Sequence, residues 1–286
     1  MPLDCVVFDF DGTLTAPGEV LPALQEATRN QLAIRLALSE EEVVRRWADA
    51  VTVVGSTPMS EGWEYEGHVV APIRADPYLW TNALTRHVVR TAATSTLPAE
   101  ALDREVVAVH RAAHEATPAP FRPDARRVID SLVSEGKHVF VVSNSDGNTI
   151  GRRLDELRLR ARDRVHVWGR AGKFVICEPA CSSGSFDAIP KSMRVEGLDR
   201  PVFLRRGRYF EKLEALWSRC GASASSTLVC GDIFEIDLAM PAALGCATHL
   251  LVRDDTLGYE RMAAASLPRG GESESLEALL DRVLRG

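Results

Sequence analysis

Short apolar runs that end in polar residues recur along the chain. Residues 5–10 form the first run, which gives way to Asp11-Gly12-Thr13. Residues 139–142 form a second, and residues 228–230 a third, which leads into Gly231-Asp232. Runs this short and this apolar are typical of strands that a parallel sheet buries on both faces. Two further strands are predicted, at 165–168 and 249–252.

Between these runs the apolar residues recur with helical spacing. Residues 128–133 have this pattern and are followed by Gly136, and residues 210–217 are followed by Gly221. Glycine commonly ends a helix because it adopts the left-handed conformation without a steric penalty. Strands that alternate with helices predict an α/β fold, a Rossmannoid parallel sheet flanked by helices.

One long segment departs from this alternation. From residue 21 to about residue 111 the pattern is mainly helical, and Ser39 with Glu42 forms a capping box at the start of one helix. The segment follows the first strand, so we expect it to be a second, mainly helical cap domain inserted there. The predicted domains are a core of residues 1–16 and 120–286 and a cap of residues 17–119.

Composition narrows the class of protein. The chain has 286 residues, 45% of them apolar, and a formal net charge of −6, which gives no general attraction to nucleic acid or anionic membranes. No apolar run is long enough to span a bilayer, and the N-terminus lacks the pattern of a signal peptide. The six cysteines are scattered, as in proteins of a reducing compartment. We therefore expect a cytoplasmic protein with a small-molecule partner.

Polar residues of related chemistry follow three of the predicted strands. Asp9 and Asp11 end the first, Ser143 and Asn144 follow the second, and Asp232 follows the third, with Asp237 close behind. Parallel sheets bind ligands beyond the carboxyl ends of their strands, so these residues should meet. Clustered carboxylates need a cation, and oxygen ligands suit magnesium, which also binds substrate phosphate. A carboxylate can attack phosphorus, and a second can transfer protons.

Three segments resemble signatures of the haloacid dehalogenase (HAD) superfamily. Residues 9–15 look like its first signature, 141–144 like its second, and 229–237 like its fourth. The resemblance implies a Rossmannoid core, a bound magnesium ion and an aspartyl-phosphate intermediate, with Asp9 as nucleophile and Asp11 as general acid and base. The other implied roles are phosphate binding by Gly12, Thr13, Ser143 and Asn144, and magnesium ligation by Asp9, Asp11, Asp232 and Asp237. For Asp237 the resemblance also allows a supporting role, to the metal site or to a basic residue.

The third signature of that superfamily, a basic residue, is less clear in this chain. The spacing leads back to a basic run that contains Arg206 and Arg208, with Lys212 one turn later, and the usual Lys-Pro pair is absent. A cation here would neutralise the nucleophile and the phosphoryl group. We favour Lys212 or Arg206 for this catalytic role, with Lys173 as a third candidate.

Two segments outside the signatures are candidates for control of the site. The cap would close over the substrate on hinges at residues 15–22 and 117–123. Residues 169–204 exceed what a minimal core needs, which predicts an extra hairpin near the site. The side chains in or beside the irregular part of the cap that could contact the leaving group are Trp63, Tyr65, His68, Arg74 and Tyr78.

The leading hypothesis is magnesium-dependent hydrolysis of a small-molecule phosphomonoester. A haloacid dehalogenase attacks carbon and needs neither magnesium nor Asp11, so Asp11 and Asp232 argue against that reaction. A phosphonate hydrolase would need a cap lysine, and residues 21–118 contain none. A phosphomutase is harder to exclude. A catalytically silent binding or regulatory relative is supported only by the departure at the third signature.

Overall fold

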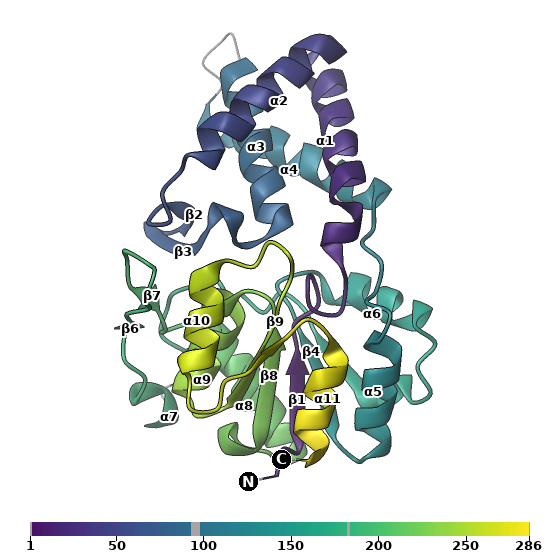
Figure 1. The fold of residues 1–286 in the computed structure, drawn as a ribbon, viewed down its shortest axis with the longest axis vertical. Helices are drawn as coiled ribbons and strands as arrows, with labels where there is room; N and C mark the ends of the chain where they lie inside the picture. Colours follow the sequence, from purple (N-terminus) through teal and green to yellow (C-terminus); the bar gives the residue numbers. More distant parts are fainter. Residues whose placement is uncertain (1, 93–97, 182–183, 286) are drawn as a thin grey trace. The chain divides into compact units, whose positions relative to one another are not determined.

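The chain folds into two compact units in the computed structural model, which describes residues 2–92, 98–181 and 184–285 (Figure 1). One unit consists of Met1–Thr15, Glu64–Ala71 and Phe121–Gly286, and the other of Ala16–Trp63 and Pro72–Pro120. The helical segment therefore follows the first strand. Residues 64–71, which the sequence interpretation placed in the cap, group with the sheet-bearing unit.

A six-stranded sheet in the order β10-β9-β8-β1-β4-β5 forms the centre of the first unit. All of its neighbouring strands run parallel, which confirms the predicted sheet. Every residue of β1 is buried, as its unbroken apolar sequence requires. The strands are β1 (Cys5–Phe8), β4 (His138–Val142), β5 (Val165–Trp168), β8 (Thr227–Gly231), β9 (Ala247–Leu251) and β10 (Glu272–Ser273).

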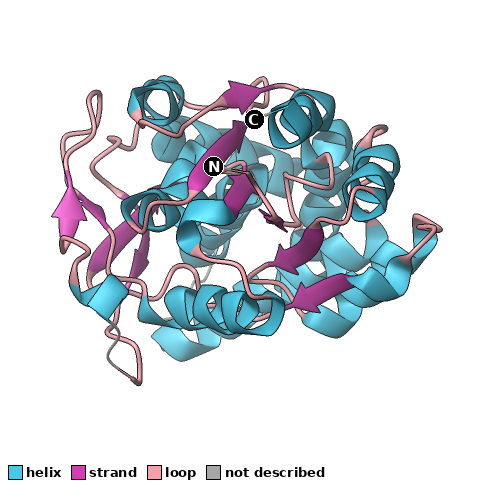
Figure 2. Ribbon diagram, turned by 90° about the horizontal axis from the view of Figure 1, so that it is seen from below, coloured by secondary structure: helices cyan, strands magenta, loops and turns pink. Residues whose placement is uncertain are grey.

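Helices cover both faces of this sheet (Figure 2). Phe8 and Leu228 from the strands share one buried core with Ile129 and Leu279 from the helices. The predicted stop at Gly221 is confirmed, because this residue ends α8 with a φ of 69°. The helices are α5 (Ala125–Ser134), α6 (Gly147–Glu156), α8 (Gly207–Cys220), α9 (Ala239–Ala243), α10 (Gly258–Ser266) and α11 (Leu276–Arg285), with 3-10 turns at Arg162–Arg164 and Ala224–Ser226.

The second unit is helical and has its own core. Ser39 caps α2 by accepting a hydrogen bond from the backbone N–H of Glu42, which is one of the two contacts of the predicted capping box. Leu32, Trp47 and Val88 are buried together between the helices. The elements are α1 (Leu21–Leu36), α2 (Glu40–Gly55), α3 (Pro77–Ala92) and α4 (Ala99–Ala116), with 3-10 turns at Pro17–Val20 and Ile73–Ala75. Among the described residues no helix is both long and apolar enough to cross a membrane.

The described residues also form two small hairpins. Strands β2 (Gly62–Tyr65) and β3 (His68–Pro72) pair within the stretch that the sequence interpretation called irregular. Strands β6 (Ser192–Met193) and β7 (Val202–Phe203) pair antiparallel after the short helix α7 (Gly184–Asp187). The second hairpin confirms the extra hairpin expected between residues 169 and 204.

Candidate active site

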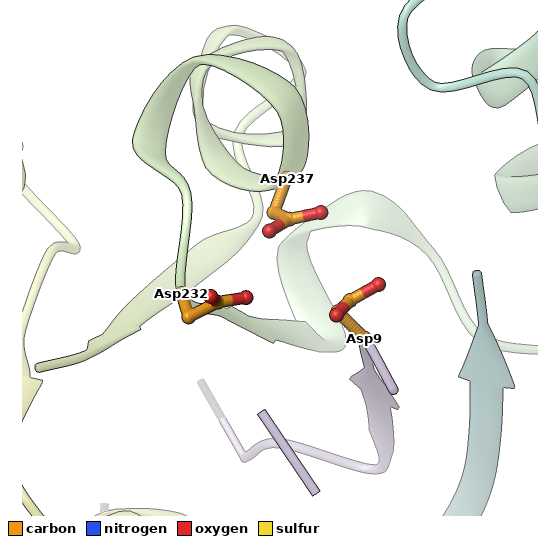
Figure 3. Close-up of side chains that lie close together, drawn as sticks. All are labelled: Asp9, Asp232 and Asp237. Carbon is orange, nitrogen blue, oxygen red and sulfur yellow. The ribbon is translucent and has the colours of Figure 1, made fainter. Parts of the chain in front are cut away.

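Three aspartates converge beyond the carboxyl ends of β1 and β8. The two strands are neighbours, with Phe8 opposite Cys230, and the N–H of Asp9 donates to the Cys230 carbonyl at 2.9 Å. Asp9, Asp232 and Asp237 each offer a carboxylate oxygen, and these oxygens lie within 4.8 Å of one another. Figure 3 shows the three side chains pointing toward one another. The expected meeting of distant strand ends therefore occurs for these residues.

A π-helical turn, Phe234–Leu238, brings Asp237 back toward Asp232. The N–H of Asp237 donates to the Ile233 carbonyl at 2.9 Å, and the N–H of Ile233 donates to Asp237 Oδ2 at 3.2 Å. A Cβ at Gly231 would lie 2.3 Å from the Cβ of Asp237, so the close return requires glycine there. Wide helical turns of this kind are frequent at functional sites.

The turn after β1 fits closely against Asp232. Gly12 has a φ of +86°, and a Cβ there would lie 2.1 Å from Asp232 Oδ2. The hydroxyl of Thr13 donates to Asp232 Oδ1 at 3.2 Å. Glycine is therefore needed at position 12 for its backbone conformation and for its lack of a side chain.

The cation in this cluster is Lys173, in the loop after β5. Its Nζ donates to Asp9 Oδ1 at 2.7 Å and to Asp237 Oδ1 at 2.8 Å, and only 1% of its side chain is exposed. Burial alone would lower the pKa of Lys173, but the carboxylates of Asp237 and Asp9 raise it, so the ammonium stays charged. Burial raises the pKa of Asp9, and Lys173 opposes that shift.

The other basic candidates lie elsewhere. Arg206 is fully buried, and its Nη1 donates to the Lys173 carbonyl at 2.7 Å. Burial lowers the pKa of Arg206 to about 10. Lys212 lies on α8 and lines a cavity of about 300 Å³ with Trp168, and the Arg208 side chain is exposed. The residue that the sequence interpretation ranked third is thus the one placed against Asp9.

Asp11 and the residues after β4 form the adjoining part of the site. The hydroxyl of Ser145 donates to Asp11 Oδ2 at 2.6 Å, and the N–H of Ser145 donates to the buried hydroxyl oxygen of Ser143 at 3.1 Å. Asn144 Oδ1 accepts a hydrogen bond from the N–H of Lys173 at 2.8 Å. Burial raises the pKa of Asp11, against the opposing hydrogen bond from Ser145. Asp11 is therefore suited to carry a proton.

Sequence reasoning missed two residues of this site. Ser145 contacts Asp11, and its position directly after Ser143-Asn144 was the available signal. Arg253 follows β9, and its Nη1 forms an ion pair with Asp232 Oδ2. Only 7% of the Arg253 side chain is exposed. No motif pointed to Arg253, because its role depends on β9 lying next to β8 in the sheet.

The aromatic and basic candidates from the irregular segment are divided between the units. In the sheet-bearing unit, the ring of Tyr65 lies 5.1 Å from that of Phe174, and His68 lies 4.7 Å from Phe203. In the helical unit, the Tyr78 ring lies 4.4 Å from that of His114, and Arg74 stacks on Trp80 at 5.5 Å. Tyr65 is thus next to the residue that follows Lys173.

The donor set fits a hard divalent cation. Asp9, Asp232 and Asp237 supply only carboxylate oxygens, which are the ligands that magnesium prefers. Lys173 and Arg253 offset part of the negative charge, and with Asp11 nearby the carboxylates still outnumber these two cations. The fold and this site together define a Rossmannoid α/β protein with an acidic centre suited to a divalent cation.

Comparisons with known proteins give the family. The family model for haloacid dehalogenase-like hydrolases matches residues 3–245, and the chain belongs to this family. No curated protein is significantly similar to the chain in sequence.

Solved structures with the same fold include a protein from Clostridium difficile provisionally described as a phosphatase, with 14% identity and a TM-score of 0.52 over 98% of this chain and 99% of that one. A predicted phosphoglycolate phosphatase from Haemophilus somnus has 15% identity and a TM-score of 0.51 over 95% and 94%. The provisionally assigned HAD-hydrolase YfnB from Bacillus subtilis, bound to magnesium, has 14% identity and a TM-score of 0.50 over 99% and 100%.

Proposed function

We propose that this protein is a magnesium-dependent phosphatase that hydrolyses a small phosphomonoester through an aspartyl-phosphate on Asp9. One observation carries the proposal. The Asp9 carboxylate lies at the end of β1, bound to the buried ammonium of Lys173 and within 4.8 Å of two further carboxylates. Family membership and the phosphatase names of two structural neighbours support the same reaction class.

In the first step an Asp9 oxygen attacks phosphorus and the bond from phosphorus to the leaving oxygen breaks. Asp11 gives its proton to that oxygen, so the alcohol leaves neutral. The raised pKa of Asp11 supports this role, because a buried carboxyl holds a proton at higher pH than an exposed one. The hydrogen bond from Ser145 fixes the orientation of the Asp11 side chain.

In the second step water attacks the phosphorus of the aspartyl-phosphate and Asp11 takes its proton. The bond between phosphorus and Asp9 breaks, which releases inorganic phosphate and restores the carboxylate. The Lys173 ammonium and the Ser143 hydroxyl would bind the phosphoryl oxygens, whose charge has to be neutralised in both steps.

Asp9, Asp232 and Asp237, whose carboxylate oxygens lie within 4.8 Å of one another, would hold magnesium, and Lys173 links Asp237 to Asp9. When bound, the ion would neutralise phosphoryl charge and favour the ionised form of Asp9. The structure of YfnB with magnesium supports this choice of metal. Removal of divalent ions with a chelator should therefore abolish phosphate release.

The alternatives are less well supported. The argument for a silent relative was the lack of a clear basic residue, and Lys173 supplies a cation at Asp9. A dehalogenase would leave the contact between Ser145 and Asp11 without a use. A phosphomutase differs in its product, because it would keep the phosphoryl group on an organic acceptor and release no inorganic phosphate.

Location and partner follow from the same proposal. We place the protein in the cytoplasm, where its six free cysteines would stay reduced. Its partner would be a small phosphorylated metabolite.

The test is phosphate release from p-nitrophenyl phosphate in the presence and absence of magnesium. We expect magnesium-dependent release that Asp9→Asn abolishes. The matched control is Asp4→Asn, because Asp4 is an exposed aspartate just before β1. Release that survives Asp9→Asn would refute the assignment, and transfer without release of inorganic phosphate would favour a mutase.

A further inference from the structure

Glu235 is a buried carboxylate that the proposed reaction does not use. It lies between Asp232 and Asp237 in the π-helical turn, and none of its surface is exposed. Burial of a charge is costly unless the charge is paired. Glu235 therefore needs a positively charged partner to stay ionised in the loop that carries Asp232 and Asp237.

That partner is Arg200, which lies between β6 and β7. Its Nη1 donates to Glu235 Oε2 and its Nη2 to Glu235 Oε1, each at 2.8 Å. Only 10% of the Arg200 side chain is exposed, and the hydroxyl of Tyr259 on α10 donates to Glu235 Oε1 at 2.9 Å. A bidentate arginine–carboxylate pair fixes the direction of both groups as well as their distance.

Arg200 belongs to the extra segment between Lys173 and α8, residues 174–206, here called the supporting segment. The same segment also holds the backbone of Lys173. Arg206, at its end, donates from Nη1 to the Lys173 carbonyl at 2.7 Å and from Nε to the Phe203 carbonyl of β7 at 3.1 Å. The N–H of Gly207 donates to the Cys177 carbonyl at 2.8 Å, which closes the base of the segment.

The supporting segment therefore contacts both the backbone of Lys173 and the side chain of Glu235. Through Arg206 it holds the residue whose ammonium binds Asp9, and through Arg200 it holds the turn that carries Asp237. We propose that Arg200 is a positioning residue that acts through Glu235 to fix the Asp232–Asp237 loop. This proposal rests on the proposed function for its catalytic consequence, but the placement of the loop can be measured separately.

Loss of Arg200 would leave the Glu235 carboxylate buried and unbalanced in charge. Removal of one partner of a buried pair is strongly destabilising for this reason. Glu235 would then turn toward water or take up a proton, and either change removes the bidentate contact that holds the π-helical turn. Asp232 and Asp237 would then lose their fixed distance from Asp9.

The experiment compares Arg200→Met with Arg194→Met. Arg194 is an exposed arginine of the same supporting segment, so it controls for the loss of a positive charge. Hydrogen exchange read by mass spectrometry reports the mobility of the peptide that contains residues 232–238, and calorimetry reports the affinity for magnesium without substrate. Both are measured on the folded full-length protein well below its unfolding temperature.

We expect Arg200→Met to speed exchange in that peptide by about tenfold and to weaken magnesium binding by roughly 10–100-fold, the usual effect of losing a residue that orients a metal ligand. Arg194→Met should match the wild type in both measurements. Arg200→Lys should fall between them, because an ammonium does not reproduce the bidentate contact. If Arg200→Met does not fold, Glu235→Gln gives the same readouts with a side chain of unchanged shape.

The proposal would be overturned if the 232–238 peptide exchanged at the same rate in Arg200→Met as in the wild type and the substitution only lowered the unfolding temperature. Faster exchange in a protein whose wild type releases no phosphate would support the positioning role and refute the proposed function. Phosphatase activity in the wild type, together with unchanged exchange of the 232–238 peptide in Arg200→Met, would support the proposed function and refute the positioning role.

Discussion

At the scale of single residues, the site depends on how Lys173 is shared. One buried ammonium binds both Asp9 and Asp237, so it reduces the repulsion between the two carboxylates and balances part of the charge of the nucleophile. A cation so placed also lies where a phosphoryl oxygen bound at Asp9 would develop charge. Such fixed groups account for a large part of many enzymatic rate enhancements.

Lys173→Met should lower kcat/KM for p-nitrophenyl phosphate by roughly a hundredfold or more, because one aligned charge is lost at the reacting group. Lys212→Met is the matched control. Its side chain lies on α8 beside a surface cavity, and activity should stay near that of the wild type. Steady-state kinetics of the two variants decide between the two lysines. A large loss in Lys212→Met with little loss in Lys173→Met would contradict this account.

The residues that sequence reasoning could find are those that end a strand. Asp9 and Asp232 could be found because an apolar run precedes each and its direction fixes where the next side chain lies. Lys173 was underrated because its distance from Asp9 depends on the path of a loop after β5. Arg253 was missed because its contact with Asp232 depends on strand order, which local pattern does not encode.

At the scale of elements, the turn after β1 and the turn after β8 have to fit each other. Gly12 and Gly231 leave room for the side chains of Asp232 and Asp237, respectively. Because these two positions lack side chains, the carboxylates of Asp232 and Asp237 can approach the backbone of the turns closely. This fit explains why strand ends so far apart in sequence can form one cluster.

Gly12→Ala should destabilise the sheet-bearing unit more than Gly136→Ala. Both residues have positive φ, at +86° and +76°, so each substitution costs about 1–2 kcal/mol in backbone conformation. Only the Cβ at position 12 meets another atom, Asp232 Oδ2, and such crowding typically adds about 1–3 kcal/mol. Chemical denaturation measures the difference. Equal losses for the two variants would show that Asp232 does not restrict the turn.

The elements themselves were largely predictable. Five of the six strands of the sheet, the stops at Gly136 and Gly221 and the N-cap at Ser39 follow from local sequence patterns, whereas β10 was not predicted. The β2–β3 hairpin was not predicted, and residues 64–71 group with the sheet-bearing unit. The contacts of this hairpin, such as that of Tyr65 with Phe174, join residues far apart in sequence, so local sequence patterns do not predict them.

At the scale of the whole molecule, buried histidines should make stability depend on pH. His249 lies on β9 with 3% of its surface exposed, and its Nε2 lies 2.7 Å from the hydroxyl of Ser273 on β10. Burial, with the nearby charge of Arg282, lowers the pKa of His249 to about 4. The unfolded chain binds a proton at a pKa of about 6.5, so unfolding takes up a proton at acidic pH.

The stability that neutral His249 provides is therefore complete above about pH 6.5 and falls as pH drops toward 4. Between about pH 7 and pH 5 this one group should lower the free energy of unfolding by roughly 2 kcal/mol. His249→Gln should remove that part of the pH dependence, whereas substitution of the exposed His138 by Gln should leave it in place. Denaturation curves at the two pH values provide the comparison. If the free energy of unfolding depended on pH in His249→Gln as it does in the wild type, the dependence would have to come from other groups.

The central claim is that Asp9 becomes phosphorylated during turnover. Acid quenching of the enzyme during hydrolysis of radiolabelled p-nitrophenyl phosphate, followed by peptide mapping, measures this directly. Label should appear on the peptide that contains Asp9, and it should be lost in Asp9→Asn but retained in Asp4→Asn. Turnover without label on that peptide, or label that persists in Asp9→Asn, would contradict the central claim.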